Sequence, residues 1–305
     1  MKGLLKRLNI YFKESHPLLK CTLIPVILFF QIYFFIILIE DVGMFRIGIP
    51  EIVGCFTLFT FLLSLRIADD FKDYKSDQLL FPDRPLPSGR VTKKDLAIVL
   101  AAVNVAAAAL NVIFMNNLLY YAALMAYGAL MSVWFFARST IQKSLPLALL
   151  THNPVGLIMN IYIISYTCIA YGLPVFTWNN LLLAFSLYWP TLMWEMARKV
   201  RAPEDETQYT TYSKLFGYKK VTWWILGIIT MDLITSAVLM YELWAWGLFA
   251  VVAAYVWFVI ECFRFLRQPK RFKLVSRIEI YEGITEVPVI LIEIGLILAR
   301  GLVWV

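Results

Sequence analysis

Residues 52–90 read IVGCFTLFTFLLSLRIADDFKDYKSDQLLFPDRPLPSGR, an apolar run that passes directly into a segment crowded with charge. Because no Pro or Gly interrupts residues 66–77, the helix of the apolar run is predicted to continue through them. At about 100° per residue, the side chains of Arg66, Asp69, Asp70, Asp73 and Asp77 then share one stripe of that helix. Four carboxylates so close repel one another unless a cation joins them. Oxygen-only ligands favour Mg²⁺, which commonly links carboxylates to phosphates, so the stripe predicts a magnesium site.

The alternative is a solvated helix end, on which Lys72 and Lys75 pair with the aspartates. The position of the stripe, at the end of an apolar run and before PDRPLPSG (82–89), favours the metal site. The prolines of this segment fix φ and cannot donate backbone hydrogen bonds. We therefore expect Pro82 to Gly89 to leave the helix and to form a stiff turn that holds Arg84 over the metal site.

The whole chain is too apolar for a water-soluble protein. Of its 305 residues, 61% are hydrophobic and 16% are charged, and a soluble domain of this size has too little interior for so many apolar side chains. A membrane span needs roughly 20 mostly apolar residues. We expect an all-α integral membrane protein that forms a single domain over residues 1–305. Its nine transmembrane helices are expected at 21–39, 48–67, 96–113, 118–137, 145–168, 181–197, 221–240, 244–263 and 282–299.

The basic residues predict the orientation in the membrane. If residues 1–20 lie in the cytoplasm, 26 of the 28 Lys and Arg residues fall in cytoplasmic segments, and Arg46 and Arg300 lie outside. Positive residues mark the cytoplasmic side, so the N-terminus is expected inside and the C-terminus outside. Anionic lipid then accounts for the net charge of +7, and no nucleic-acid partner is expected.

Residues 1–20 are basic and amphipathic, without the apolar core and cleavage site of a signal peptide. They are typical of a short helix that lies in the membrane interface before the first span. The four cysteines lie in or beside spans and lack CxxC spacing, so neither a disulfide nor a zinc site is expected.

The motif in the first polar loop resembles a known family. DDFKDYKSD (69–77) followed by RPLPSGRVT (84–92) is similar to the first aspartate-rich motif of the UbiA superfamily of intramembrane prenyltransferases, in which NDxxDxxxD precedes an RPLPSG-like turn. Asp69 stands where that family usually has Asn. The resemblance implies a nine-helix bundle with a cytoplasmic cap, and cytoplasmic active-site loops at 69–95 and 198–220. It further implies that Mg²⁺, held by Asp69, Asp70, Asp73 and Asp77, binds a prenyl diphosphate, with Arg66 and Arg84 as further contacts of the diphosphate.

The second polar loop departs from the family pattern. Residues 194–217 read WEMARKVRAPEDETQYTTYSKLFG, and TYSKLFG (211–217) fits the end of the usual motif, whereas its DxxxD pair has no clean counterpart. We expect Glu195 and Asp205 to hold the second metal, and Arg198, Lys199 and Arg201 to contact the diphosphate. Pro203 followed by Glu204, Asp205 and Glu206 is equally typical of an ordinary helix N-terminus, so the roles of these acids stay open.

Three further polar residues lie at or inside the spans. The resemblance makes Arg138 the candidate for a basic residue that contacts the diphosphate in this family. The alternative is that Arg138 only anchors the end of the span at the cytoplasmic face of the membrane. His152 and Asn153 lie inside the span predicted at 145–168, where ionisable groups usually face a cavity or a partner. They are candidates for contact with the acceptor, or for a kink beside Pro154.

These features predict an enzyme that ionises a polyprenyl diphosphate with Mg²⁺ and transfers the prenyl group to an aromatic or quinone-precursor acceptor. The alternative is a terpene cyclase of the same superfamily, which uses the diphosphate alone. A transporter or lipid-binding scaffold is a third hypothesis, but it does not need the aspartate stripe. The expected location is a bacterial inner membrane, with the active site on the cytoplasmic side. The prenyl chain length, the acceptor and the oligomeric state are left open by the sequence.

Overall fold

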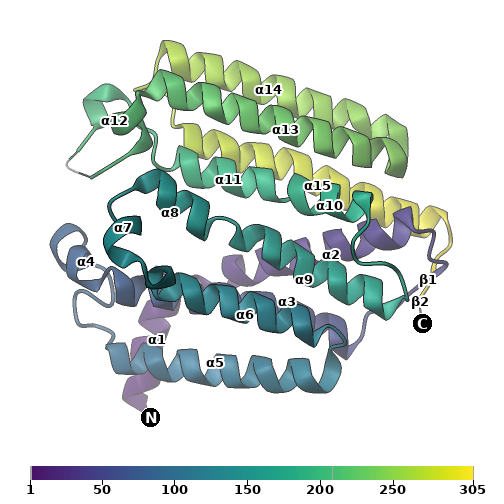
Figure 1. Ribbon diagram of the computed structural model, residues 1–305, viewed down its shortest axis with the longest axis horizontal. Helices are drawn as coiled ribbons and strands as arrows, with labels where there is room; N and C mark the ends of the chain where they lie inside the picture. The colour runs from purple at the N-terminus through teal and green to yellow at the C-terminus, as the bar shows by residue number, and fades with distance from the viewer. Residues whose placement is uncertain (1, 208, 305) are drawn as a thin grey trace. The chain divides into compact units, whose positions relative to one another are not determined.

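The computed structural model describes residues 2–207 and 209–304, which are helical over most of their length (Figure 1). The chain divides into two compact units, one formed by Met1–Phe30 and Arg46–Phe136, the other by Gln31–Phe45 and Ala137–Val305. The expected all-α class is confirmed, and the two short strands β1 (Met44–Phe45) and β2 (Val303–Trp304) pair in parallel within the second unit.

The first unit is built around helix α3. It contains α1 (Lys2–Glu14), the first part of α2 (Leu18–Ile39), α3 (Ile49–Lys72), α4 (Tyr74–Leu80), α5 (Lys93–Phe114), α6 (Leu118–Ser132) and the 3₁₀ helix η1 (Trp134–Phe136). Helix α3 packs against α5 and α6. The approach of α6 depends on Gly128, because a Cβ at this position would lie 2.6 Å from the Phe61 ring.

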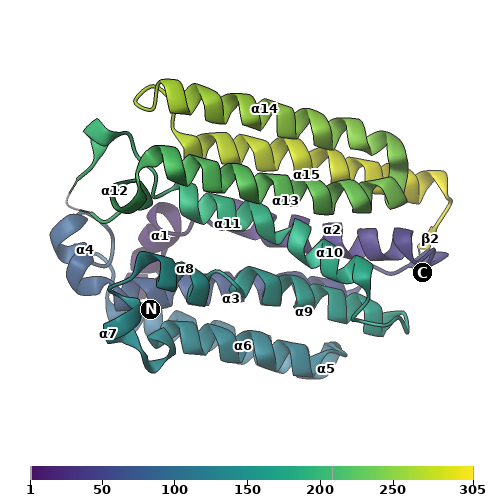
Figure 2. The same ribbon diagram turned by 45° about the horizontal axis from the view of Figure 1, so that its top comes forward.

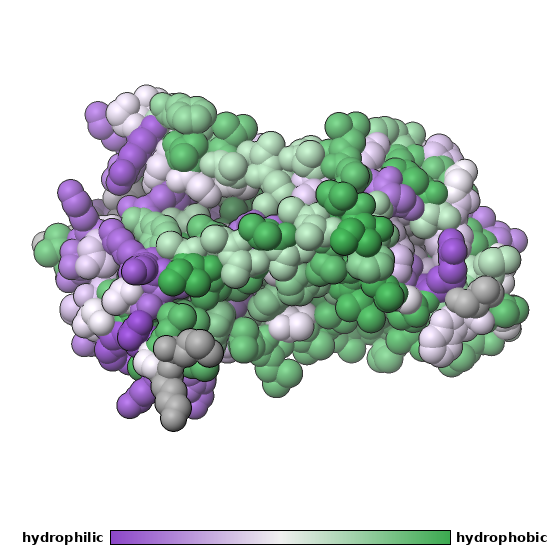
Figure 3. All heavy atoms as spheres, turned by 90° about the horizontal axis from the view of Figure 1, so that it is seen from below, coloured by the Kyte–Doolittle hydropathy of each residue, from purple (hydrophilic) through white to green (hydrophobic). Residues whose placement is uncertain are grey.

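Apolar side chains also cover the outside of this unit. Helix α5 exposes Ile98, Val105, Val112 and Ile113. Hydrophobic side chains predominate in the middle of the surface drawn in Figure 3. Helix α5 begins with a capping box, in which Thr92 accepts a hydrogen bond from the Asp95 amide and Asp95 accepts one from the Thr92 amide. The capping box provides partners for backbone amides at the start of α5, and the exposed apolar side chains of this helix suit contact with lipid.

The second unit holds the C-terminal half of α2 and the helices from residue 138 onward. These are α7 (Arg138–Ile141), α8 (Leu145–His152), α9 (Val155–Ala170), α10 (Trp178–Ser186), α11 (Tyr188–Ala197), η2 (Pro203–Asp205), α12 (Tyr212–Phe216), α13 (Tyr218–Trp244), η3 (Ala245–Gly247), α14 (Leu248–Arg267) and α15 (Leu274–Ala299). Helices α13, α14 and α15 lie side by side in both ribbon views (Figure 2), and α10 and α11 pack against α13. Their buried core includes Ile225, Phe258 and Ile278.

Helices cover most residues of the predicted spans, and several of these spans are divided. In the span predicted at 118–137, α6 ends at Ser132 and η1 begins at Trp134. The span predicted at 145–168 breaks between α8 and α9 at Asn153 and Pro154, and the one at 181–197 breaks at Leu187 between α10 and α11. Within the described part of the chain, five stretches are long and apolar enough to cross a membrane. They are Cys21–Ile39, Ile49–Lys72, Lys93–Phe114, Leu145–Ala170 and Tyr218–Arg267, the last of which contains both α13 and α14. The chain is therefore an integral membrane protein by composition and helix length.

Candidate active site

The aspartates of the first polar loop lie where α3 ends, and the prediction of one continuous helix through residues 66–77 is wrong. Helix α3 ends at Lys72, and Asp73, with φ −94° and ψ 5°, separates it from α4. The Asp73 carbonyl accepts hydrogen bonds from the Asp77 amide at 2.8 Å and from Ser76 Oγ at 2.8 Å. Asp and Ser compete for backbone groups in this way and favour helix ends. The break leaves Asp69 and Asp73 exposed, whereas Asp70 and Asp77 are buried.

Asp70 is held by groups from two helices. Its Oδ2 accepts a hydrogen bond of 2.7 Å from the hydroxyl of Tyr11 on α1, and its Oδ1 lies 3.0 Å from Arg66 one turn earlier on α3. Burial, followed by the negative charge of Asp70, raises the pKa of Tyr11 well above its usual range, so the hydroxyl remains a donor. Tyr11 was not predicted from the sequence, because nothing local marks a tyrosine of the N-terminal segment as a partner of an aspartate 59 residues away.

Asp77 is paired with the turn that follows it. Arg84 Nη1 donates to Asp77 Oδ2 at 2.9 Å, and its guanidinium lies 4.0 Å from the centre of the Phe81 ring. Residues 82–89 leave the helix as predicted, with Gly89 at φ +75°, a region that favours glycine. Asp70 lies within electrostatic range of Arg66, Asp77 and Arg84. The first unit therefore brings two buried carboxylates and two guanidinium groups together.

The N-terminal segment forms the predicted helix over residues 2–14, and this helix is joined to the unit by ion pairs; Met1 lies outside the described residues. Arg7 makes two bonds of 2.7 Å to Asp95, and Arg90 makes bonds of 2.6 and 2.7 Å to Glu14. Arg90 lowers the pKa of the Glu14 carboxyl, and it also donates to the carbonyl of Asp83 in the proline-rich turn. Helix α1 thus supports both the aspartates and the turn.

The described carboxylates suit Mg²⁺ in chemical type but do not form a complete cage. Asp69 pairs with Lys72 at 2.7 Å. Among residues 2–207 and 209–304, no three His, Cys, Asp or Glu side chains come together in a way that could hold a metal ion. Mg²⁺ is usually bound by one or two carboxylates, with water and substrate phosphates as the other ligands. Asp70 and Asp77 provide two carboxylates of this kind in the first unit.

In the second unit, the carboxylate of Glu195 on α11 forms ion pairs with two basic residues that directly follow this helix. Its carboxylate lies 2.6 Å from Arg198 and 3.1 Å from Lys199, so the predicted face of one acid and two cations is present. The Arg198 guanidinium also lies 5.3 Å from the centre of the Trp194 ring. The carboxylate and both cations lie at the end of α11 where the second polar loop begins.

That loop is organised by Glu206. The Glu206 carboxylate accepts hydrogen bonds from Thr211 Oγ1 and Ser213 Oγ, and Thr211 caps α12 through the Lys214 amide. Arg201 donates to Thr207 Oγ1 at 3.0 Å, while Asp205 is exposed at the end of η2. Gln208, within the predicted active-site loop 198–220, lies outside the described residues. Pro203 and the acids after it form only a short 3₁₀ turn, and Glu206 supports the loop itself.

The remaining predicted residues also lie in the second unit. Arg138 is exposed at the start of α7, where its Nε donates to Gln142 at 3.2 Å. His152 ends α8, with its Nδ1 2.9 Å from Thr151 Oγ1, and Asn153 is buried at the break before α9. The break at Asn153 and Pro154 supports the kink interpretation of this pair.

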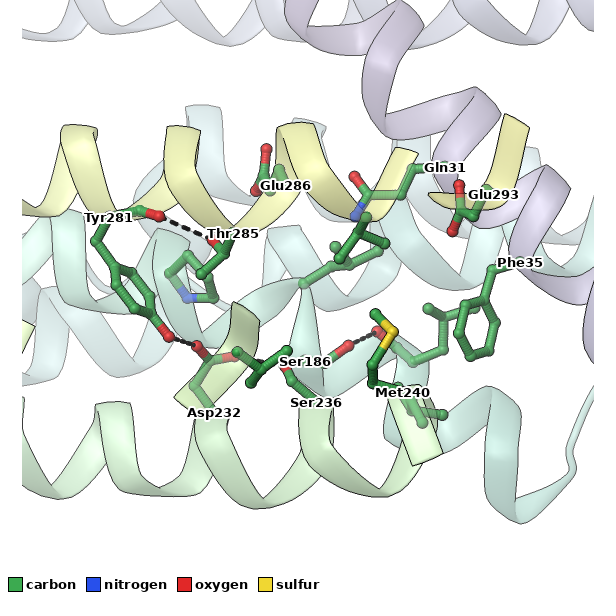
Figure 4. Close-up of a pocket in the computed structure, with 16 residues that line it drawn as sticks. Gln31, Phe35, Ser186, Asp232, Ser236, Met240, Tyr281, Thr285, Glu286 and Glu293 are labelled. Atoms are coloured by element: carbon green, nitrogen blue, oxygen red, sulfur yellow. Dashed lines mark hydrogen bonds between the residues drawn. The ribbon is translucent and has the colours of Figure 1, made fainter. Parts of the chain in front are cut away.

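The second unit contains a cavity of about 60 Å³ that was not predicted from the sequence (Figure 4). Its lining comes from α2, α10, α11, α13, α14 and α15 and includes Asp232, Tyr281, Glu286 and Glu293. The hydroxyl of Tyr281 donates to Asp232, and so does Ser236 Oγ at 3.2 Å. The available signal was the presence of three acidic residues inside predicted spans, because such residues are rare and usually functional.

One solved structure matches the fold over almost the whole chain. It is described as giving structural and mechanistic insights into the biosynthesis of digeranylgeranylglyceryl phosphate synthase in membranes, and it aligns with a probability of 1.00, a TM-score of 0.65 and 17% sequence identity. The alignment covers 95% of this chain and 99% of that one. At this level of identity the match shows that the chain shares the fold of that membrane synthase, which agrees with the fold implied by the sequence resemblance. No protein-family model and no curated protein matches the sequence.

Proposed function

We propose that this chain is a Mg²⁺-dependent intramembrane prenyltransferase that ionises a polyprenyl diphosphate and transfers the prenyl group to an aromatic or quinone-precursor acceptor. The proposal places the chain in a bacterial inner membrane with nine spans, the N-terminus inside and the acidic loops on the cytoplasmic side. The prenyltransferase-like fold and the apolar helices support it, as does the placement of the basic residues.

The observation that carries the proposal is the pairing of two buried aspartates with two arginines at the polar end of a 24-residue apolar helix. Asp70 and Asp77 are each held by an arginine within 3.0 Å. A carboxylate at the end of a membrane span is costly unless a partner or a function maintains it. Two carboxylates and two planar guanidinium groups match the needs of a metal-bound diphosphate, since arginine binds phosphate oxygens through two parallel hydrogen bonds.

The reaction breaks the bond between the allylic carbon and the diphosphate oxygen, and negative charge grows on the leaving group. When bound, Mg²⁺ supplies charge neutralisation at that oxygen, and Asp70, Asp73 and Asp77 are the residues assigned to hold it, with Asp69 beside them. Arg66 and Arg84 stabilise the departing diphosphate more strongly than the bound substrate. Tyr11 keeps Asp70 oriented through its hydrogen bond, and aromatic ring faces stabilise the allylic cation.

The second unit is assigned a supporting set of residues under the same proposal. Glu195 and Asp205 are proposed ligands of a second metal, and Arg198, Lys199, Arg201 and Arg138 are proposed contacts of the diphosphate. The pairing of Glu195 with two cations supports a role in binding an anion, because an anion can draw Arg198 away from the carboxylate. His152 and Asn153 are proposed to face the acceptor or to take its proton after alkylation.

The test uses purified full-length protein with Mg²⁺ and each of several prenyl diphosphates, with and without aromatic acceptors. Release of pyrophosphate together with a prenylated acceptor is the expected result. Hydrocarbon formed from the diphosphate alone would identify a cyclase instead, and the absence of pyrophosphate in every mixture would refute both enzymes.

The control is the double variant Asp70→Asn/Asp77→Asn, which keeps side-chain size and removes two charges. It should release no pyrophosphate above background in the same mixtures. Equal turnover by this variant and the wild type would show that the observed activity does not arise from the proposed site.

A further inference from the structure

The cavity of the second unit has an unusual lining for a chamber within a bundle of apolar helices. Among the described residues that line it, three are acidic, namely Asp232, Glu286 and Glu293. The same set of described residues contains no Lys, Arg or His. Gln31, Ser186, Ser236 and Thr285 add further oxygen atoms (Figure 4). The described lining thus offers oxygen acceptors and three carboxyl groups without a basic side chain to pair with them.

Two side chains in this lining carry acceptor oxygens without a hydrogen-bond partner in the described part of the chain. Glu293 is 0% exposed, and neither of its carboxyl oxygens has a partner among the described residues. Gln31 is 5% exposed, and its Oε1 has no partner in the same part of the chain. Figure 4 draws both among the side chains that line the cavity, Gln31 from α2 and Glu293 from α15. Buried polar groups are nearly always hydrogen-bonded, so two orphaned acceptors at one cavity indicate a ligand that donates hydrogen bonds.

Asp232, in contrast to Glu293, already has hydrogen-bond partners within the protein. Asp232 accepts hydrogen bonds from Tyr281 and Ser236, and Tyr281 is itself buried. Asp232 therefore contributes negative charge near the cavity while Glu293 and Gln31 keep their acceptors available. The acceptor oxygens that remain available for a ligand therefore belong to Gln31 on α2 and Glu293 on α15.

We propose that this cavity binds an organic ammonium group. A primary ammonium carries a positive charge and three N–H donors, which suit the two available carboxyl oxygens of Glu293 and the Oε1 of Gln31 in the same lining. An anionic ligand such as a diphosphate would find no basic side chain among the described residues of this lining.

The remaining lining defines the rest of the ligand. Phe35, Leu239, Met240 and Val289 cover the walls with apolar surface. A single water requires about 10–15 Å³ of such space, so a cavity of about 60 Å³ accepts a head group with a few carbon atoms. The ligand class is therefore a primary amine with a short apolar body. This site goes beyond the proposed prenyl transfer, because none of its residues takes part in that proposal.

The test measures saturable binding of radiolabelled n-butylamine, which is protonated at neutral pH, to the purified full-length protein in a scintillation proximity assay. Unlabelled n-butylamine should displace the label, while 1-butanol, which has the same chain and no charge, should not displace it at equal concentration. Glu293→Gln should weaken binding at least about tenfold, as expected for the loss of a hydrogen-bonded charge pair. Glu279→Gln is the matched control, because it makes the same change on α15 at an exposed position outside the cavity lining and should bind as the wild type does.

Absence of saturable binding to the wild type would overturn the proposal, and so would equal affinity in Glu293→Gln. Equal displacement by 1-butanol would show that the site takes a neutral hydroxyl donor. If Glu293→Gln does not elute as a folded protein, Gln31→Met decides the question, since it removes the second acceptor at similar size. Unchanged affinity in a folded Gln31→Met would then refute the assignment.

Discussion

Replacement of Tyr11 by Phe tests whether the N-terminal helix α1 supports the aspartate cluster. The substitution keeps the buried ring and removes only the hydroxyl, which donates to Asp70 Oδ2 at 2.7 Å. A hydrogen bond to a charged group contributes about 1.5–3 kcal/mol. Arg66 still contacts the other oxygen of the same carboxylate at 3.0 Å. We therefore expect the free energy of unfolding to fall by about 1.5–2 kcal/mol, the lower part of that range.

The assay is reversible unfolding of the purified protein in mixed micelles with a rising fraction of SDS, followed by circular dichroism. Tyr74→Phe is the matched control on α4. Its hydroxyl accepts a hydrogen bond from Gln78 at 3.1 Å in an exposed position, and surface substitutions usually change stability by less than about 0.5 kcal/mol. Tyr11→Phe should also raise the Mg²⁺ concentration needed for half-maximal pyrophosphate release, because Asp70 loses one of its two supports.

Equal stability losses in Tyr11→Phe and Tyr74→Phe would refute the reasoning, because the Asp70 bond would then contribute no more than a surface contact. A large loss of stability without a change in the Mg²⁺ requirement would limit Tyr11 to a structural role.

Three other predictions concern the same unit. Asp73→Asn should lower pyrophosphate release at saturating Mg²⁺ by at least about 100-fold, the size of effect seen when one charge-stabilising group is lost, and Asp69→Asn should be milder; a near-wild-type Asp73→Asn would remove this aspartate from the site. Burial, followed by the positive charge of Arg66, lowers the pKa of His16. The stability that depends on a neutral His16 is therefore fully present above the unfolded pKa of histidine, and it is lost as the pH falls through the lower folded pKa. Acidification from pH 7 to pH 5 should therefore lower the melting temperature of the wild type more than that of His16→Gln, and parallel curves would contradict this. A cysteine placed at Ser76 should react with an impermeant label only from the cytoplasmic face, and labelling from outside would overturn the proposed nine-span orientation.

Local patterns in the sequence were sufficient to predict the all-helical class and the positions of most helices. The apolar runs predicted nine helical segments because a membrane span needs only length and low polarity, and both can be read from consecutive residues. The proline-rich turn at 82–89 was also predictable, since each proline restricts its own backbone. The helix break at Asp73 was not, because the competition between Ser76 Oγ and the backbone becomes visible only when their positions are known.

The partners of the charged residues were decided by tertiary structure. Tyr11 meets Asp70 across 59 residues, Arg7 meets Asp95 across 88, and Tyr281 meets Asp232 across 49. Each pair depends on which helix faces pack together, and helical periodicity assigns a residue to a face without identifying the helix opposite. The glutamates of α15 were visible as acids within a predicted span. Only the packing of α2, α13 and α15 shows that Glu293 lies beside a cavity and that its carboxyl group has no hydrogen-bond partner among the described residues. The sequence therefore shows which positions of the spans carry ionisable side chains, whereas the contacts between helices decide which groups pair with them.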